Sequence, residues 1–156
     1  MFEKGIATKI NAMFVDRILL SVDETMNYLK PEYRKKAVVT GNPVRKDFFS
    51  GNPQKGLEFL GLDNKKPLVF VVGGSQGSGE INDLVYSVRR ELSEKYYIAH
   101  QTGSGASVPP SDIEGYIQLP FIRKEIADVI AAASLVITRA GAGSLWELSA
   151  EGKASL

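Results

Sequence analysis

The stretch PLVFVVGGSQG, from Pro67 to Gly77, indicates the fold class of this 156-residue chain. Pro67 to Val72 is apolar at nearly every position, which is typical of a strand that is covered on both faces of a sheet. A glycine-rich turn, Gly73–Gly77, follows directly. The next segment predicts an amphipathic helix, because apolar side chains recur at helical spacing. These side chains are Ile81, Leu84, Val85, Val88 and Leu92.

The same alternation of short strands and helices runs along the rest of the chain. Strands are predicted at residues 17–20, 37–40, 97–101, 116–119 and 135–138, and helices at 21–29, 54–60, 125–133 and 144–151. Local signals support the helices: a capping box at Ser21 and Glu24, helix starts at Asn42-Pro43 and Asn52-Pro53, and a glycine stop at Gly61. The last residues, 153–156, resemble the start of another strand. Together they predict an α/β fold, a Rossmann-like and mostly parallel sheet with flanking helices.

Composition excludes several classes of protein. Nineteen Lys and Arg balance eighteen Asp and Glu, a net charge of +1, which argues against a dedicated nucleic-acid binder. No apolar run approaches the ~18 residues of a membrane span, and the first residues do not predict a signal peptide. The chain has no cysteine and one histidine, which excludes disulfides, thiolate chemistry and multi-histidine metal sites.

The first glycine loop, Gly73–Gly77, is a candidate anion site. Glycines allow a tight turn and expose backbone N–H groups, and the N-terminus of the following helix carries a partial positive charge. Ser75 offers a hydroxyl donor. The loop matches neither the P-loop nor the dinucleotide pattern G-x-G-x-x-G. From the residues alone, a ligand-free turn and a phosphate site are equally compatible with it.

The second glycine loop, Arg139–Ser144, is a candidate anion site for the same reason, because it also lies between a strand and a helix. Two such loops at one edge of a sheet suit a diphosphate better than one. The spacing of Ser144 and Glu147 favours a capping box. The alternative is that the Glu147 carboxylate binds a ribose diol.

Two further residues have competing interpretations, and a third has one. Arg45, in the loop Thr40–Arg45, is either a solvated residue at a helix start or a cation that reaches a diphosphate. His100 stands at a strand end, where a single histidine is more often structural than catalytic. Trp146 is expected in the core.

Five motifs occur in a fixed order: Thr40–Arg45, Gly73–Gly77 with Ile81-Asn82, His100–Gly103, Pro120–Ile122, and Arg139–Ala142 with Glu147. This ensemble resembles the MurG family of bacterial N-acetylglucosaminyltransferases of peptidoglycan synthesis, from about residue 6 to 156. The resemblance implies a GT-B architecture of two Rossmann-like domains, of which the chain is a fragment. Residues 1–36 would be a linker helix–strand–helix remnant. Residues 37–156 would be the donor-binding domain, truncated at its C-terminus.

The resemblance also implies a reaction and a location. The family transfers GlcNAc from UDP-GlcNAc to lipid I, with inversion at the anomeric carbon, and forms lipid II. It needs no bound metal or other cofactor and binds no nucleic acid. It works in the cytoplasm, peripherally on the inner membrane, through an amino-terminal domain that is absent here. The acceptor loop and the candidate general base are absent with it, so no catalytic residue and no activity are expected of this chain alone.

The donor contacts carry over onto nine positions. Arg45 and Ser75 would contact the diphosphate, with Gln76 and Gly77 beside it. Ile122 would hold the uracil through its backbone. Ala142, Gly143 and Ser144 would present the second helix N-terminus to the phosphates. Glu147 would bind the ribose hydroxyls, although the spacing alone favours a capping box.

The sequence departs from the family pattern at several points. Gly143 and Ser144 stand where the family often has Leu or Ala and Thr. His100 matches the family's His-Gln motif and not its general base, and the chain stops before the Asp-x-Gln segment. Two alternatives remain: a UDP-GlcNAc 2-epimerase, which shares the GT-B fold but needs carboxylates and histidines around the sugar, and a non-catalytic nucleotide-sugar-binding module.

Overall fold

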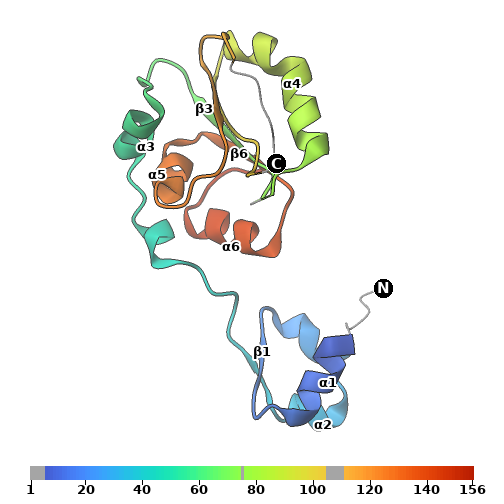
Figure 1. The fold of residues 1–156 in the computed structure, drawn as a ribbon. Coiled ribbons are helices and arrows are strands. Elements are labelled where there is room, and N and C mark those ends of the chain that lie inside the picture. Colours follow the sequence, from blue (N-terminus) through green and yellow to red (C-terminus); the bar gives the residue numbers. More distant parts are fainter. Residues whose placement is uncertain (1–5, 75, 105–110) are drawn as a thin grey trace. The chain divides into compact units, whose positions relative to one another are not determined.

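In a computed structural model, which describes residues 6–74, 76–104 and 111–156, the chain divides into two units (Figure 1). The N-terminal unit is Met1–Pro43 and the C-terminal unit is Val44–Leu156. The sequence suggested a division after residue 36. Residues 37–43 go with the first unit because the strand Ala37–Val39 pairs there with Ile18–Leu20.

The N-terminal unit contains a small parallel sheet that the sequence did not reveal. Its elements are α1 (Ile6–Phe14), β1 (Ile18–Leu20), the 3-10 helix η1 (Asp23–Tyr28), α2 (Pro31–Arg34) and β2 (Ala37–Val39). The predicted capping box at Ser21 is wrong. The N-cap of η1 is Val22, and the Ser21 hydroxyl donates to Asn42 Oδ1 at 3.1 Å instead.

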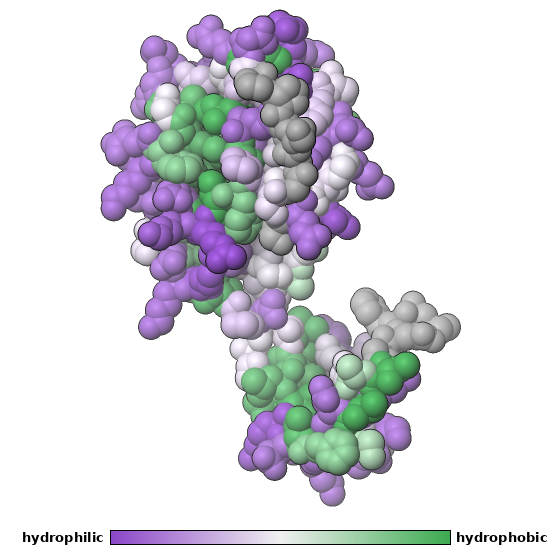
Figure 2. Space-filling view, in the orientation of Figure 1, coloured by the Kyte–Doolittle hydropathy of each residue, from purple (hydrophilic) through white to green (hydrophobic). Residues whose placement is uncertain are grey.

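Apolar side chains stay on the surface of this unit. Figure 2 shows them as a green area over its elements. They include Ile6, Met13 and Phe14 of α1, and Leu19 of β1 is exposed as well. None of the described helices is long and apolar enough to cross a membrane.

The C-terminal unit is built on a four-stranded parallel sheet. Its strands are β3 (Leu68–Val72), β4 (Tyr97–Gln101), β5 (Tyr116–Leu119) and β6 (Leu135–Thr138). They lie in the order β5-β4-β3-β6, so the α/β prediction with a parallel sheet is confirmed. The chain moves outward from β3 to β5 and then returns to the other side of β3. The chain therefore has a topological switch point between β3 and β6, where α/β proteins bind ligands.

The helices of this unit begin and end largely where capping residues predict. They are η2 (Lys46–Phe49), α3 (Pro53–Leu60), α4 (Gly79–Ser93), α5 (Ile126–Ala132) and α6 (Ala142–Ala150). Asn52 caps α3 by accepting the Lys55 N–H at 3.1 Å, and Gly61 ends it at φ +66°. The helix start predicted at Asn42-Pro43 is wrong, since Asn42 binds Ser21 and the first helical turn begins at Lys46.

The core fills both faces of the sheet, and β3 is buried along its whole length. Phe70 packs with α5 on one face, and Val71 packs with Val85 of α4 on the other; Figure 1 shows α4 and α5 on opposite sides of β3. The expectation for Trp146 is wrong, because its side chain is 37% exposed. Leu148, two positions later and therefore on the opposite side of α6, supplies the buried contact.

The chain end adds a short parallel contact to β6. The Leu156 N–H donates to the Val136 carbonyl at 2.9 Å, and the Thr138 N–H donates to the Leu156 carbonyl at 2.9 Å. The strand-like character of residues 153–156 is therefore confirmed as a bridge between Ser155 and Val136.

Candidate functional site

A cavity of about 250 Å³ lies at the carboxyl ends of β3 and β6. The two glycine loops form its walls, with residues from both strand ends: Gly73, Gly74, Thr138, Arg139, Gly141 and Ser144. The two loops predicted to share one edge of the sheet therefore meet in one cavity. The cavity lies at the topological switch point, where the two loops diverge from neighbouring strands.

Two helices begin beside this cavity without side-chain caps. Ser78 precedes α4 and Gly141 precedes α6, and neither makes a side-chain cap hydrogen bond. In α6 the Leu145 N–H is bonded to the Gly141 carbonyl at 3.0 Å, so the N–H groups before it have no partner within the helix. Uncapped helix N-termini carry a partial positive charge and bind anions such as phosphate.

The first glycine loop rests directly on the backbone that follows β4. Gly74 and Gly77 have φ angles of +92° and +81°, which favour glycine. A Cβ atom on Gly77 would lie 2.0 Å from the Thr102 carbonyl oxygen, and one on Gly103 would lie 2.4 Å from the Gly77 nitrogen. The loop therefore requires glycine for close packing as well as for its turn.

The second loop contains a strained backbone position. Ala140 has a φ angle of +54°, in the left-handed region, just before α6. Such a conformation costs about 1–3 kcal/mol in a residue that has a Cβ atom, and it concentrates at functional sites. Arg139, next to it, lines the cavity.

Arg45 and Glu147 form an ion pair in this unit. Arg45 Nε donates to Glu147 Oε1 at 2.9 Å, and the guanidinium carbon lies 4.5 Å from the ring centroid of the buried Phe48. The capping box predicted at Ser144 and Glu147 is wrong. The helix begins earlier, at Ala142, so Glu147 lies in its second turn and binds Arg45 instead.

The other predicted donor-site residues have different surroundings. Ser144 lines the cavity, while Ala142 and Gly143 form the exposed first turn of α6. Ile122 has a buried side chain, and its N–H donates to Gln101 Oε1 at 3.0 Å. Gln76 is exposed, and Gly77 follows it in the loop. Ser75 lies outside the described residues.

His100 is completely buried, at 0% exposure, in a polar cluster beneath the first loop. Its Nδ1 lies 2.8 Å from the Tyr116 hydroxyl and its Nε2 lies 3.0 Å from Asn82 Oδ1. Burial, together with the nearby positive charge of Arg89, lowers the pKa of His100 to about 4. The ring is therefore neutral near pH 7, as a structural histidine would be.

Three residues of this region received no role from the sequence, although Asn82 and Arg139 lie in its motifs. Arg139 and Thr138 line the cavity, and Asn82 connects the buried cluster to the loop. The position of Arg139 directly after a strand was a usable signal for a cation at the ligand edge. In residues 6–74, 76–104 and 111–156, no three His, Asp or Glu side chains are placed to hold a metal ion.

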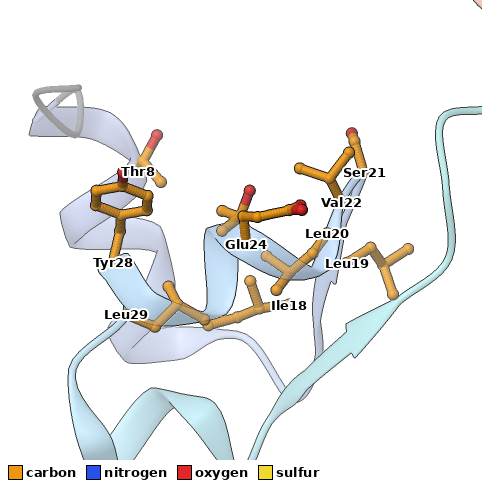
Figure 3. Close-up of a pocket in the computed structure, with 10 residues that line it drawn as sticks. Thr8, Ile18, Leu19, Leu20, Ser21, Val22, Glu24, Tyr28 and Leu29 are labelled. Atoms are coloured by element: carbon orange, nitrogen blue, oxygen red, sulfur yellow. The ribbon is translucent and has the colours of Figure 1, made fainter. Parts of the chain in front are cut away.

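A larger cavity, about 540 Å³, lies within the N-terminal unit (Figure 3). Its lining is mainly apolar, with Ile18, Leu20 and Leu29 among the residues drawn. The described lining residues include the carboxylate of Glu24 and no lysine or arginine. This chemistry does not suit a diphosphate.

Comparison with known proteins gives a family match. The glycosyltransferase family 28 C-terminal domain matches residues 68–156, more than half of the chain. The matched segment starts at β3 and contains both glycine loops, β6 and α6.

Two curated relatives carry the same name, UDP-N-acetylglucosamine–N-acetylmuramyl-(pentapeptide) pyrophosphoryl-undecaprenol N-acetylglucosamine transferase. The protein of Treponema denticola is 41% identical over 97% of this chain, and that of Legionella pneumophila is 40% identical over 96%. The chain spans about two-fifths of their length, 42% and 41%. The crystal structure of Acinetobacter baumannii MurG shares the fold, with a TM-score of 0.51 and 24% identity over 77% of this chain and 35% of that one.

Proposed function

The chain belongs to the glycosyltransferase family 28 C-terminal domains, and from this premise we propose that it binds UDP-GlcNAc as the donor part of a transferase that converts lipid I to lipid II. The observation that carries the proposal is the cavity between the two glycine loops, with two uncapped helix N-termini beside it. A diphosphate placed there would receive backbone N–H groups from both loops. The names of the relatives supply the identity of the nucleotide sugar.

In this proposal each part of the nucleotide has its own contacts. Ser75, Gln76 and Gly77 of the first loop and Ala142, Gly143 and Ser144 of the second surround the diphosphate, with Arg45 as its cation. The backbone carbonyl of Ile122 holds the uracil, since the Ile122 N–H already donates to Gln101 Oε1. Glu147 accepts hydrogen bonds from the ribose hydroxyls.

The same groups would assist the transfer step. The C4 hydroxyl of the acceptor attacks the anomeric carbon while the bond to the UDP oxygen breaks, so negative charge grows on the diphosphate. Backbone N–H groups of the two loops and the Arg45 guanidinium would stabilise that charge, because fixed donors do so without reorganisation during the reaction. The attack comes from the face opposite UDP, which inverts the anomeric centre.

We assign the remaining steps to parts of the transferase outside this chain. The chain spans about two-fifths of its relatives, and the acceptor lipid, the general base and the membrane-binding surface belong to the other part. The complete protein then works at the cytoplasmic face of the inner membrane. The chain alone binds the donor and transfers nothing.

A titration of the 15N-labelled chain with UDP tests donor binding. We expect amide shifts at Gly73, Gly74 and Ala142–Ser144, with a weaker response to CDP because the Ile122 backbone reads uracil. Uridine, without phosphates, is the matched control and should leave the loop amides largely unmoved. If millimolar UDP leaves all of these amides unchanged, the proposal is wrong.

A further inference from the structure

Three buried polar side chains form a hydrogen-bonded chain beneath the first glycine loop. Asn82 comes from α4, His100 from β4 and Tyr116 from β5. Asn82 Nδ2 donates to the Thr102 carbonyl at 3.1 Å, so its Oδ1 faces His100 Nε2 at 3.0 Å. The Nε2 atom therefore carries the proton, and Nδ1 accepts from the Tyr116 hydroxyl at 2.8 Å. With this assignment of protons, each hydrogen bond that these three side chains make has one donor and one acceptor.

This hydrogen-bonded chain ends at the backbone that supports the glycine loop. The Thr102 carbonyl, which Asn82 holds, is the atom against which Gly77 packs, at 2.0 Å from the position of an added Cβ. The Thr102 and Gly103 N–H groups are bonded to the Leu119 and Pro120 carbonyls at 2.9 Å. The loop thus lies on a backbone segment that is held from two sides.

Asn82 also ties the start of α4 to the end of β4. Its own N–H donates to the Ser78 carbonyl at 2.8 Å, in the first turn of the helix. A shift of Asn82 would therefore move the helix N-terminus and the Thr102 carbonyl together. Both border the glycine loop.

Burying three polar groups is costly, and apolar side chains would fill the same space without that cost. A fully satisfied polar network holds one geometry more strictly than apolar packing does. We propose that Asn82, His100 and Tyr116 are positioning residues that hold the first glycine loop in the geometry that receives the donor diphosphate. This inference rests on the proposed function.

Two matched substitutions test it. Tyr116→Phe removes the hydroxyl at one end of the hydrogen-bonded chain. Tyr86→Phe is the control, because its ring also lies beside His100, at 5.5 Å between centroids, while its hydroxyl accepts from Gln118 at 3.2 Å and does not lead to Thr102. We expect Tyr116→Phe to weaken UDP binding about 3- to 10-fold, the effect of one lost hydrogen bond, and Tyr86→Phe to change it less than about twofold.

A second pair separates positioning from simple stabilisation. Gln at position 100 keeps one donor and one acceptor, whereas Leu keeps neither, so His100→Gln should retain UDP affinity that His100→Leu loses. Uridine affinity should stay unchanged in all variants that fold, because the network acts on the phosphate loop. Amide exchange should accelerate at Gly77 and Gly103 in Tyr116→Phe and not at Val71 of β3.

The outcomes are distinct. If the wild-type chain does not bind UDP, the proposed function fails, and this inference fails with it. If the wild type binds UDP and Tyr116→Phe and Tyr86→Phe have equal affinities and equal exchange at Gly77, the network is structural only and the inference alone is overturned.

Discussion

Arg45 and Glu147 are 102 positions apart in the sequence and are joined by a 2.9 Å hydrogen bond. They are the residues proposed to bind the diphosphate and the ribose, and the free chain already holds them together. The hydrogen bond to Glu147 uses Nε of Arg45. The two terminal nitrogens of the guanidinium donate to no other described residue and are left for a phosphate. A pair this exposed contributes about 0–1 kcal/mol, so ligand binding can rearrange it at little cost.

Arg45→Ala should weaken UDP binding by about 1.5–3 kcal/mol, the range for hydrogen bonds to charged groups. The free energy of unfolding should fall by less than about 1 kcal/mol, because the ion pair is partly exposed. Calorimetric titration and urea unfolding measure the two quantities. Arg123→Ala is the control, since this guanidinium lies over another ring, that of Phe121. Unchanged UDP affinity in Arg45→Ala would remove Arg45 from the diphosphate site.

Glu147→Gln should weaken UDP binding by about 1–2 kcal/mol, because a charged acceptor makes the stronger hydrogen bonds to the ribose. Glu147 does not cap α6, and its ion pair with Arg45 is partly exposed, so the free energy of unfolding should fall by less than about 1 kcal/mol. The comparison of UDP with 2′,3′-dideoxy-UDP gives a sharper measurement. Equal wild-type affinities for the two nucleotides would show that Glu147 does not bind the ribose.

His100 should make stability depend on pH. Burial lowers the pKa of His100 in the folded chain to about 4, below the ordinary 6.5, so the folded chain takes up this proton at a lower pH than the unfolded chain does. The stabilisation is complete above pH 6.5 and is lost as the pH falls toward 4, by about 3 kcal/mol in total. Urea unfolding of the wild type and of His100→Gln from pH 7.5 to 4 measures it. Parallel curves for the two proteins would contradict the assignment.

At the scale of elements, the site depends on where strands end and helices begin. β3 and β6 end side by side, and α4 and α6 begin without side-chain caps at the same edge. α3, on which no ligand role falls, is capped by Asn52. Leaving helix N-termini uncapped costs about 1 kcal/mol each, a cost that a bound anion would remove.

Two glycine-to-alanine substitutions separate the roles of the loops. Gly77→Ala should destabilise the unit by at least about 2 kcal/mol, because its φ of +81° and the Thr102 carbonyl both exclude a Cβ atom. Gly143→Ala should stabilise it by about 0.5–1 kcal/mol, since Gly143 lies in α6 with nothing within 4 Å of an added Cβ. Urea unfolding gives both values. Equal effects would mean that the close approach at Gly77 does not constrain the loop.

At the scale of the whole molecule, the sheets of the two units differ in how far they are covered. The C-terminal unit has a sheet covered on both faces. The N-terminal unit has two parallel strands with Leu19 exposed, and parallel sheets are normally buried on both faces. The chain also spans about two-fifths of its relatives.

The chain alone should form no lipid II from UDP-GlcNAc and a lipid I analogue. Transfer requires the acceptor hydroxyl to be held beside the anomeric carbon and its proton to be removed, and both functions are assigned to the other part of the transferase. A multiple-turnover assay with a radiolabelled donor measures this. A full-length relative serves as the positive control, and sustained product from this chain would refute the division of roles.

The family and the architecture were readable from the sequence because their signals are local. The buried strand Leu68–Val72, the cap of α3 at Asn52 and Gly61, and the two glycine loops each depend on a few neighbouring residues. Strand burial, capping and turn conformation are short-range properties, so composition and spacing predict them. The resemblance of five ordered motifs to one family added the donor chemistry.

Only the tertiary structure decided which side chains meet. Glu147 pairs with Arg45 instead of capping its helix, Ser21 binds Asn42 instead of capping η1, and Trp146 stays exposed because Leu148 takes the buried side of α6. The hydrogen-bonded chain beneath the first loop likewise joins α4, β4 and β5. Each of these outcomes is a competition between a local partner and one that is distant in sequence. Local spacing describes the first partner, and only the packed sheet brings the second within reach.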